Sequence, residues 1–189
     1  NNTSYNYSTE NVMLKASNVG GSDYFGYSVA ISGNYAIVGA YWEDSSGTNQ
    51  TGAYDSGAAY IFELRGGKWG NYNSSYNYST ENVMLKASNV TASDEFGYSV
   101  AISGNYAIVG AYYEDSSGSP TNAIAGDSGA AYIFELSGGT WGNNTSYNYS
   151  TENVMLKASD VSEGDRFGTS VAISGNYAIV GAPYEDSSG

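Results

Sequence analysis

The 189-residue sequence contains no cysteine and no histidine, only two prolines and only six basic residues. Without cysteine there is no disulfide framework, and without either cysteine or histidine there is no thiolate or imidazole metal site. The lack of histidine also removes the usual base of a serine-based catalytic triad. What the chain does have is 20 tyrosines and 25 glycines. Its aromatic and β-branched bias favours strands.

The charge balance is acidic, with 19 acidic residues and a net charge of −13. Six scattered basic residues cannot form the basic face that a nucleic-acid binder needs, so we expect no nucleic-acid partner. No apolar run approaches the roughly 18 residues of a membrane span, and we expect no such span. An acidic surface is instead suited to gathering cations such as Ca²⁺.

The dominant feature is a tandem repeat, which is the first pattern to look for in a sequence. Three sets of segments are identical between copies: residues 4–17, 75–88 and 146–159; residues 28–40, 99–111 and 170–182; and residues 55–64 and 127–136. We divide the chain into repeat 1 (residues 1–70), repeat 2 (residues 71–142) and a truncated repeat 3 (residues 143–189). Repeat 3 stops before the last of these segments.

Each complete repeat predicts four short strands, so the fold class is all-β. Large and small residues alternate over residues 25–32, which is the period of a strand with one crowded face. Gly33-Asn34 suits a primed hairpin turn into the next strand. The four strands expected in repeat 1 are residues 11–17, 25–32, 35–41 and 58–64.

The copies differ mainly in two loops, whereas the strand segments are identical. Such a division separates a fixed packing scaffold from variable surface positions. The first loop comprises residues 18–24, 89–95 and 160–166, and the second comprises residues 48–54 and 119–126.

Two short motifs carry a family resemblance. The pairs Phe25-Gly26, Phe96-Gly97 and Phe167-Gly168 each precede Ser-Val-Ala-Ile-Ser, and the return strands end in Gly39-Ala40-Tyr41, Gly110-Ala111-Tyr112 and Gly181-Ala182-Pro183. The chain therefore resembles the FG-GAP repeat, found in the β-propeller of integrin α subunits and in tandem-repeat surface proteins of microbes. The resemblance implies tandem four-stranded antiparallel blades packed as in a β-propeller. The Asp-rich calcium loop of integrin-like members is replaced here by Ser32-Gly33-Asn34, so that calcium site is not carried over.

A closed propeller typically uses 4–8 blades, more than this chain holds. We expect either an open array or partial units that complete one another between copies of the chain, head to tail or by strand sharing. A head-to-tail contact that fails to close a ring generates a filament. The edge that repeat 3 leaves without its Ala-Ala-Tyr-Ile-Phe-Glu-Leu strand is a place for strand addition.

Asn-x-Ser/Thr sequons recur in register and predict N-linked glycans. A chain rich in serine and asparagine also makes sequons by chance, which is the alternative. Asn6 lies between Tyr5 and Tyr7, so in an extended strand it faces away from both rings, and a glycan requires a surface position. The predicted glycosylation sites are Asn2, Asn6, Asn73, Asn77, Asn144 and Asn148.

Loop aspartates Asp44 and Asp55 recur as Asp115 and Asp127, flanked by serine and glycine. They offer hard oxygen ligands for Ca²⁺. The alternative, which we favour, is that they form turns and solvate the surface. A glycosidase needs two carboxyl groups with different roles in a single cleft. Because the same acids appear in every repeat, we expect no enzyme, and no cofactor apart from this candidate Ca²⁺.

The sequence thus predicts a structural repeat protein of an extracellular or cell-surface scaffold or filament, N-glycosylated and assembled with copies of itself. The alternative is a propeller-type adhesion module that binds a protein or a carbohydrate through its variable loops.

Overall fold

The computed structural model describes residues 10–18, 20–45, 53–89, 91–116, 125–144 and 149–186, and all the regular elements there are strands. The strands are β1 (Met13–Lys15), β2 (Ser28–Ser32), β3 (Tyr35–Ala40), β4 (Ala58–Arg65), β5 (Lys68–Trp69), β6 (Asn71–Asn73), β7 (Tyr78–Thr80), β8 (Val83–Leu85), β9 (Ser99–Ser103), β10 (Tyr106–Ala111), β11 (Ala130–Ser137), β12 (Thr140–Trp141), β13 (Asn143–Asn144), β14 (Tyr149–Thr151), β15 (Val154–Leu156), β16 (Ser170–Ser174) and β17 (Tyr177–Gly181). Within these residues no helix has the length and apolar character needed to cross a membrane.

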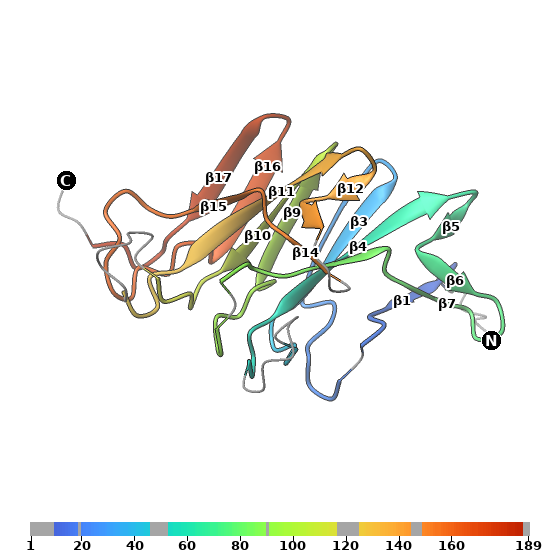
Figure 1. Ribbon diagram of the computed structural model, residues 1–189, viewed down its shortest axis with the longest axis horizontal. Helices are drawn as coiled ribbons and strands as arrows, with labels where there is room; N and C mark the ends of the chain where they lie inside the picture. Colours follow the sequence, from blue (N-terminus) through green and yellow to red (C-terminus); the bar gives the residue numbers. More distant parts are fainter. Residues whose placement is uncertain are drawn as a thin grey trace, which may run out of the picture.

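Two four-stranded antiparallel blades form the centre of the molecule. The first blade has the strand order β2-β3-β4-β8, and the second has the order β9-β10-β11-β15. A third blade is represented by the hairpin β16-β17. The blades follow one another along the long axis of Figure 1, from the N-terminal end at the right to the C-terminal end at the left. The predicted fold class, all-β with tandem antiparallel blades, is confirmed.

The fourth strand of each blade comes from the following repeat. β8 belongs to repeat 2, yet it pairs with β4 of repeat 1, with Tyr60 opposite Met84. From the sequence we expected the equivalent residues 11–17 in the blade of their own repeat. Because every copy of this segment is identical, the pattern alone could not say which sheet edge it joins. The blades are therefore interlocked, because each four-stranded sheet contains strands of two repeats. The repeat boundaries at residues 70 and 142 divide the sequence, and they stay a prediction.

The Phe-Gly pair is a turn that precedes its strand. We predicted a strand from residue 25, but β2 begins at Ser28 because Gly26 has φ +93°. Its N–H donates to the carbonyl of Gly39, 3.0 Å away, which ties the turn to β3. The hairpin at Gly33-Asn34 is a two-residue turn with positive φ at Gly33 alone, as in the II′ class.

Each blade presents two faces to its neighbours. We call the face of the first blade with Ala36, Val38, Tyr60 and Phe62 its upstream face, and the opposite face with Ile37, Ala59 and Ile61 its downstream face. The downstream face of the first blade shares one core cluster with the upstream face of the second blade, formed by Ala107, Val109, Tyr132 and Phe134. Blades therefore stack upstream face on downstream face.

A second link between repeats is parallel. β1 pairs with β7, and β8 pairs in the same way with β14. The Tyr-Ser-Thr strands of repeats 2 and 3 thus lie beside the Met-Leu segment of the repeat before them, and add backbone hydrogen bonds along the sheet edge.

Stacking predicts unequal effects of one substitution at equivalent positions. Ile102 on the upstream face of the second blade is 7% exposed, whereas Ile31 at the same position of the first blade is 66% exposed. We expect Ile102→Ala to lower the free energy of unfolding by about 3 kcal/mol, because it removes buried methyl groups. Ile31→Ala should cost less than about 1 kcal/mol, measured by urea denaturation. Equal losses would contradict this stacking.

Candidate functional site: the junction between repeats

Glycines allow the backbones of neighbouring blades to meet. A Cβ atom built on Gly39 would lie 2.0 Å from the carbonyl oxygen of Gly97, in the Phe-Gly turn of the next repeat. That same oxygen accepts a hydrogen bond of 2.7 Å from the Ser28 hydroxyl. Gly97 itself has φ +95°, which disfavours any residue with a side chain. The Phe-Gly and Gly-Ala motifs are therefore the two halves of one contact between blades.

Backbone hydrogen bonds extend this contact on the side of the second variable loop. The N–H groups of Glu95 and Phe96 donate to the carbonyls of Asp55 and Ser56, at 3.2 and 3.0 Å. Gly57 and Phe96 form an isolated parallel bridge. The incoming turn is thus held by main-chain bonds that any sequence with the same glycines can make.

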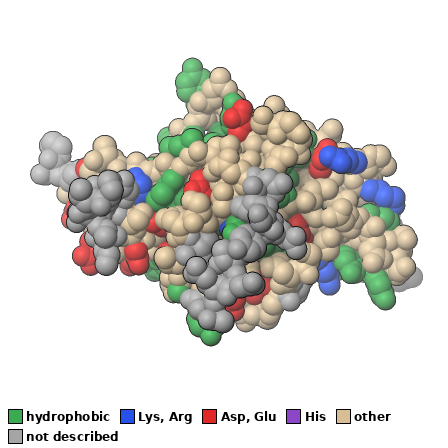
Figure 2. Space-filling view, in the orientation of Figure 1, with side chains coloured by type: hydrophobic (Ala, Val, Ile, Leu, Met, Phe, Trp, Pro, Cys, Tyr) green, Lys and Arg blue, Asp and Glu red, His purple; other side chains and the backbone are tan. Residues whose placement is uncertain are grey.

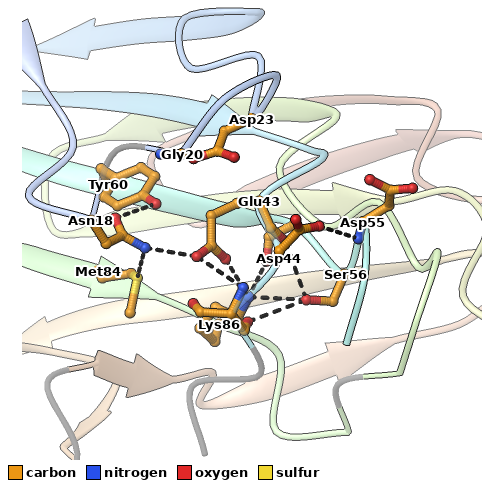
Figure 3. Close-up of polar contacts among 12 residues, drawn as sticks. Asn18, Gly20, Asp23, Glu43, Asp44, Asp55, Ser56, Tyr60, Met84 and Lys86 are labelled. Carbon is orange, nitrogen blue, oxygen red and sulfur yellow. Dashed lines mark hydrogen bonds and ion pairs between the residues drawn. The ribbon is translucent and has the colours of Figure 1, made fainter. Parts of the chain in front are cut away.

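A buried lysine crosses the same junction (Figure 3). The Lys86 ammonium is 0% exposed and lies 2.8 Å from Glu43 Oε2. It also donates to Ser56 Oγ at 3.1 Å and to the Gly57 carbonyl at 2.6 Å. Burial lowers the pKa of Lys86, and the Glu43 carboxylate opposes that shift. A buried charge persists only with such partners, so the Lys86 site requires two repeats in contact.

The network continues through an amide to a buried phenol. Asn18 Nδ2 donates to Glu43 Oε1 at 2.7 Å, and the Tyr60 hydroxyl donates to Asn18 Oδ1 at 2.9 Å (Figure 3). Burial raises the pKa of Tyr60, so the phenol stays protonated and acts as a donor. Asn18, Tyr60 and Glu43 all belong to repeat 1, so these hydrogen bonds orient within one repeat the carboxylate that binds Lys86 of the next.

The second junction repeats these contacts. Lys157 lies 2.7 Å from Glu114 Oε2 and 2.8 Å from Ser128 Oγ. A Cβ on Gly110 would lie 2.0 Å from the Gly168 carbonyl oxygen, which accepts a 2.7 Å hydrogen bond from Ser99. The junction is thus a recurring unit of structure.

The candidate calcium ligands are held within their loops. Asp44 Oδ1 accepts a hydrogen bond from the Asp55 backbone N–H at 3.0 Å, and Asp115 does the same for Asp127 at 2.9 Å. In the parts of the chain that the structure describes, no three acidic side chains gather as a metal-binding group. The Asp44 and Asp115 contacts are those of loop-forming aspartates, and calcium binding stays a prediction.

Only part of the glycosylation prediction falls on described residues. Asn77 is exposed, in a turn with φ +52°, and Asn73 is half-buried with its Oδ1 bound to the Ser75 N–H. The Tyr76-Asn77-Tyr78 segment is therefore a turn running into β7, in contrast to the extended strand we assumed for the equivalent Tyr5-Asn6-Tyr7. Asn144 lies in β13, while Asn2, Asn6 and Asn148 lie outside the described residues. Glycosylation stays a prediction.

Lys86 and Lys157 were not predicted from the sequence as junction residues. Their signal was present, since a lysine follows Val-Met-Leu in every copy and a glutamate precedes Asp44, Asp115 and Asp186. A lone lysine beside a strand is usually solvated, however, and the fold brings it to Glu43 across 43 residues of sequence. Trp141 also packs across the junction, since the centroid of its ring lies 5.3 Å from that of Tyr35 in the preceding blade.

The glycine contact predicts a position-dependent effect of one methyl group. Gly39→Ala should lower the free energy of unfolding by about 3 kcal/mol, because the Gly97 carbonyl would have to withdraw. The matched control is Gly181→Ala, where the first neighbour is the movable Ser170 hydroxyl instead of a backbone carbonyl. We expect a clearly smaller loss there by urea denaturation, and equal losses would argue against the contact.

The ion pair predicts a second contrast between repeats. Lys86→Met should cost about 3–5 kcal/mol, because it leaves the buried Glu43 carboxylate without its cation. Adding Glu43→Gln should recover part of that loss. Lys15→Met changes the equivalent exposed lysine and should cost less than about 0.5 kcal/mol. Similar thermal shifts for Lys86→Met and Lys15→Met would contradict the assignment.

Asp94 predicts a pH dependence. It accepts hydrogen bonds from the Thr91 N–H and hydroxyl, and burial raises its pKa to about 7. Because the folded state then holds this proton more tightly than the unfolded state, stability should fall as pH rises from about 4 to about 7. Asp94→Asn should reduce that fall by on the order of 2 kcal/mol. Urea denaturation of both proteins at pH 4.5 and 8 measures the difference, and identical pH profiles would refute it.

Comparison with known proteins agrees with this geometry. A family model described as FG-GAP repeat matches residues 9–62, 80–134 and 151–189. No curated protein matches the chain. The matched segments contain both halves of the blade contact, the Phe-Gly turns and the Gly-Ala strand ends, in three copies. The chain therefore belongs to the FG-GAP repeat family, as a propeller-type repeat module.

Proposed function

We propose that this chain is a structural module of an extracellular or cell-surface scaffold, in which further copies of the repeat continue the stack as an open filament. One observation carries the proposal: the two junctions are built from the same glycine contact and the same lysine–glutamate pair. A heterologous contact that repeats itself without closing extends a chain of units indefinitely.

The outer faces of the stack match the buried ones. Ile179 on the downstream face of the third blade is 71% exposed, whereas the equivalent Ile37 and Ile108 are fully buried. On the upstream face of the first blade, Val29 and Ile31 are both 66% exposed. Covering one such side chain contributes about 1.5–3 kcal/mol. A further repeat at either face would bury the same positions that are buried inside the stack.

A hollow marks the upstream face of the first blade. Its volume is about 550 Å³, and its lining includes Leu14, Ile31 and Trp69. In the next blade the position equivalent to Ile31 is Ile102, which is covered by the preceding blade. The hollow therefore lies where a preceding blade would pack, with Leu14, Ile31 and Trp69 as its apolar part.

Charge supports the same orientation of neighbours. In Figure 2 basic side chains gather mainly at the end of the molecule that holds β5 and β6, while acidic side chains are spread over the rest of the visible face. A basic end of one copy that meets the mainly acidic surface of another favours their encounter. Catalysis forms no part of the proposal, because Glu43 and Glu114 are occupied by lysines. The exposed Asn77 suits the proposed glycans.

Electron microscopy of the purified chain over a range of concentrations tests this function. We expect regular fibres, and Ile31→Lys should abolish them because it places a charge on the upstream face. The matched control is Tyr76→Lys, which changes a 74% exposed side chain in a turn and should leave fibres intact. Monodisperse particles at every concentration, or fibres that survive Ile31→Lys, would overturn the proposal.

A propeller-type adhesion module is the second candidate, and a row of aromatic rings favours it. Tyr24, Tyr27 and Tyr41 lie beside Trp42 and Tyr98, with centroid distances of 4.6–5.5 Å. Tyr24 and Tyr27 are about half exposed. Tyrosine and tryptophan surfaces are common in binding sites. Carbohydrate or protein ligands that change Trp42 fluorescence, with no fibre formation, would support this function over the scaffold.

A further inference from the structure

The contacts that hold blades together cannot tell one neighbour from another. The glycine contact, the serine hydrogen bond and the lysine–glutamate pair are the same at both junctions. These contacts alone would therefore allow repeat 3 to dock on repeat 1 as well as on repeat 2. Misassembly of this kind is a characteristic failure of repeat proteins. Correct order needs contacts that differ between junctions.

Two variable positions meet across each junction. We call the residue before Phe-Gly the pre-Phe position (Tyr24, Glu95 and Arg166). The second residue after Gly-Ala is the ring position (Trp42, Tyr113 and Tyr184). The pre-Phe residue of one repeat contacts the ring residue of the repeat before it. All three pre-Phe residues have φ between +54° and +57°. The backbone conformation is therefore the same in each repeat, and only the side chain differs.

The side chains at the two junctions are paired by different chemistry. At the first junction, Trp42 Nε1–H donates to Glu95 Oε1 at 3.3 Å, and Glu95 is only 8% exposed. At the second, the Arg166 guanidinium carbon lies between two rings, 5.0 Å from the centroid of Tyr113 and 4.7 Å from that of Tyr184 in its own repeat. An indole offers a donor to a carboxylate, whereas the negative face of a phenol ring attracts a guanidinium and repels a carboxylate.

We infer that the pairs Trp42–Glu95 and Tyr113–Arg166 are specificity-determining contacts that set the order in which repeats dock. Glu95 placed against Tyr113 would lose its indole N–H donor and face the electron-rich surface of a neutral ring. A second difference acts in the same direction. The ring of Tyr98 lies 5.1 Å from Tyr27 and 5.5 Å from Tyr41, and repeat 3 has Thr169 in its place. The inference concerns docking within one chain and holds whether or not the chain forms filaments.

A double-mutant cycle at the second junction of the full chain tests the inference. Arg166→Glu creates the mismatched pair, and adding Tyr113→Trp recreates the pair found at the first junction. We expect Arg166→Glu to lower the folding equilibrium constant at least fivefold, and the double variant to recover most of that loss. Arg65→Glu carries the same charge change on an exposed hairpin and should not be rescued by Tyr113→Trp.

An exchange variant measures discrimination at constant composition. Glu95→Arg with Arg166→Glu exchanges the two pre-Phe residues. We expect this variant to lower the folding equilibrium constant at least fivefold. The loss should arise at the second junction, because at the first junction an arginine can also stack on the Trp42 ring. The control exchanges Arg65 and Ser137, at equivalent exposed positions, and should change the constant less than twofold. Additive effects in the cycle, or an exchange no worse than its control, would overturn the inference.

Discussion

The close approach of one backbone to another at Gly39 is the constraint on which the stack depends. The Gly97 carbonyl reaches β3 of the preceding blade only because no side chain stands there. That approach brings Phe96 and Ile102 into the shared core and places Glu95 beside the aromatic row. The two family motifs are thus explained by one contact, whose halves lie in different repeats. Their physical role is visible only when two repeats are placed together.

The pairing of β8 with β4 joins successive repeats within one sheet. Each of the two four-stranded blades is completed by a strand of the next repeat, and the lysine that follows this strand is buried against the preceding repeat. Removing a neighbouring repeat would expose an apolar face and would leave a buried carboxylate without its lysine partner. Buried ion pairs contribute little net stability, but they are costly to break. The arrangement therefore favours complete junctions over partial ones, which suits an array of units that are marginal alone.

Much of this fold could be predicted from the sequence. The alternation in Ser-Val-Ala-Ile-Ser, the Gly33-Asn34 turn and the buried run of β4 are local signals, and each corresponds to the observed strand or hairpin. The limits of β2 were predicted less well, because the pattern of Phe25-Gly26 continues that of the strand while Gly26 turns the chain. The lysine site was not predicted, since nothing local indicates that Lys86 is buried.

Sequence by itself determined the identity of the strands, the tight turns and the recurrence of one unit, because these follow from periodicity and from residues that permit positive φ. Only the tertiary structure decided which unit each strand completes, because identical segments carry no information about their partners. It also decided that Glu43 binds a lysine, and that two variable loop residues meet across each junction. Those contacts join residues far apart in the chain, and only packing of blade on blade brings them within reach.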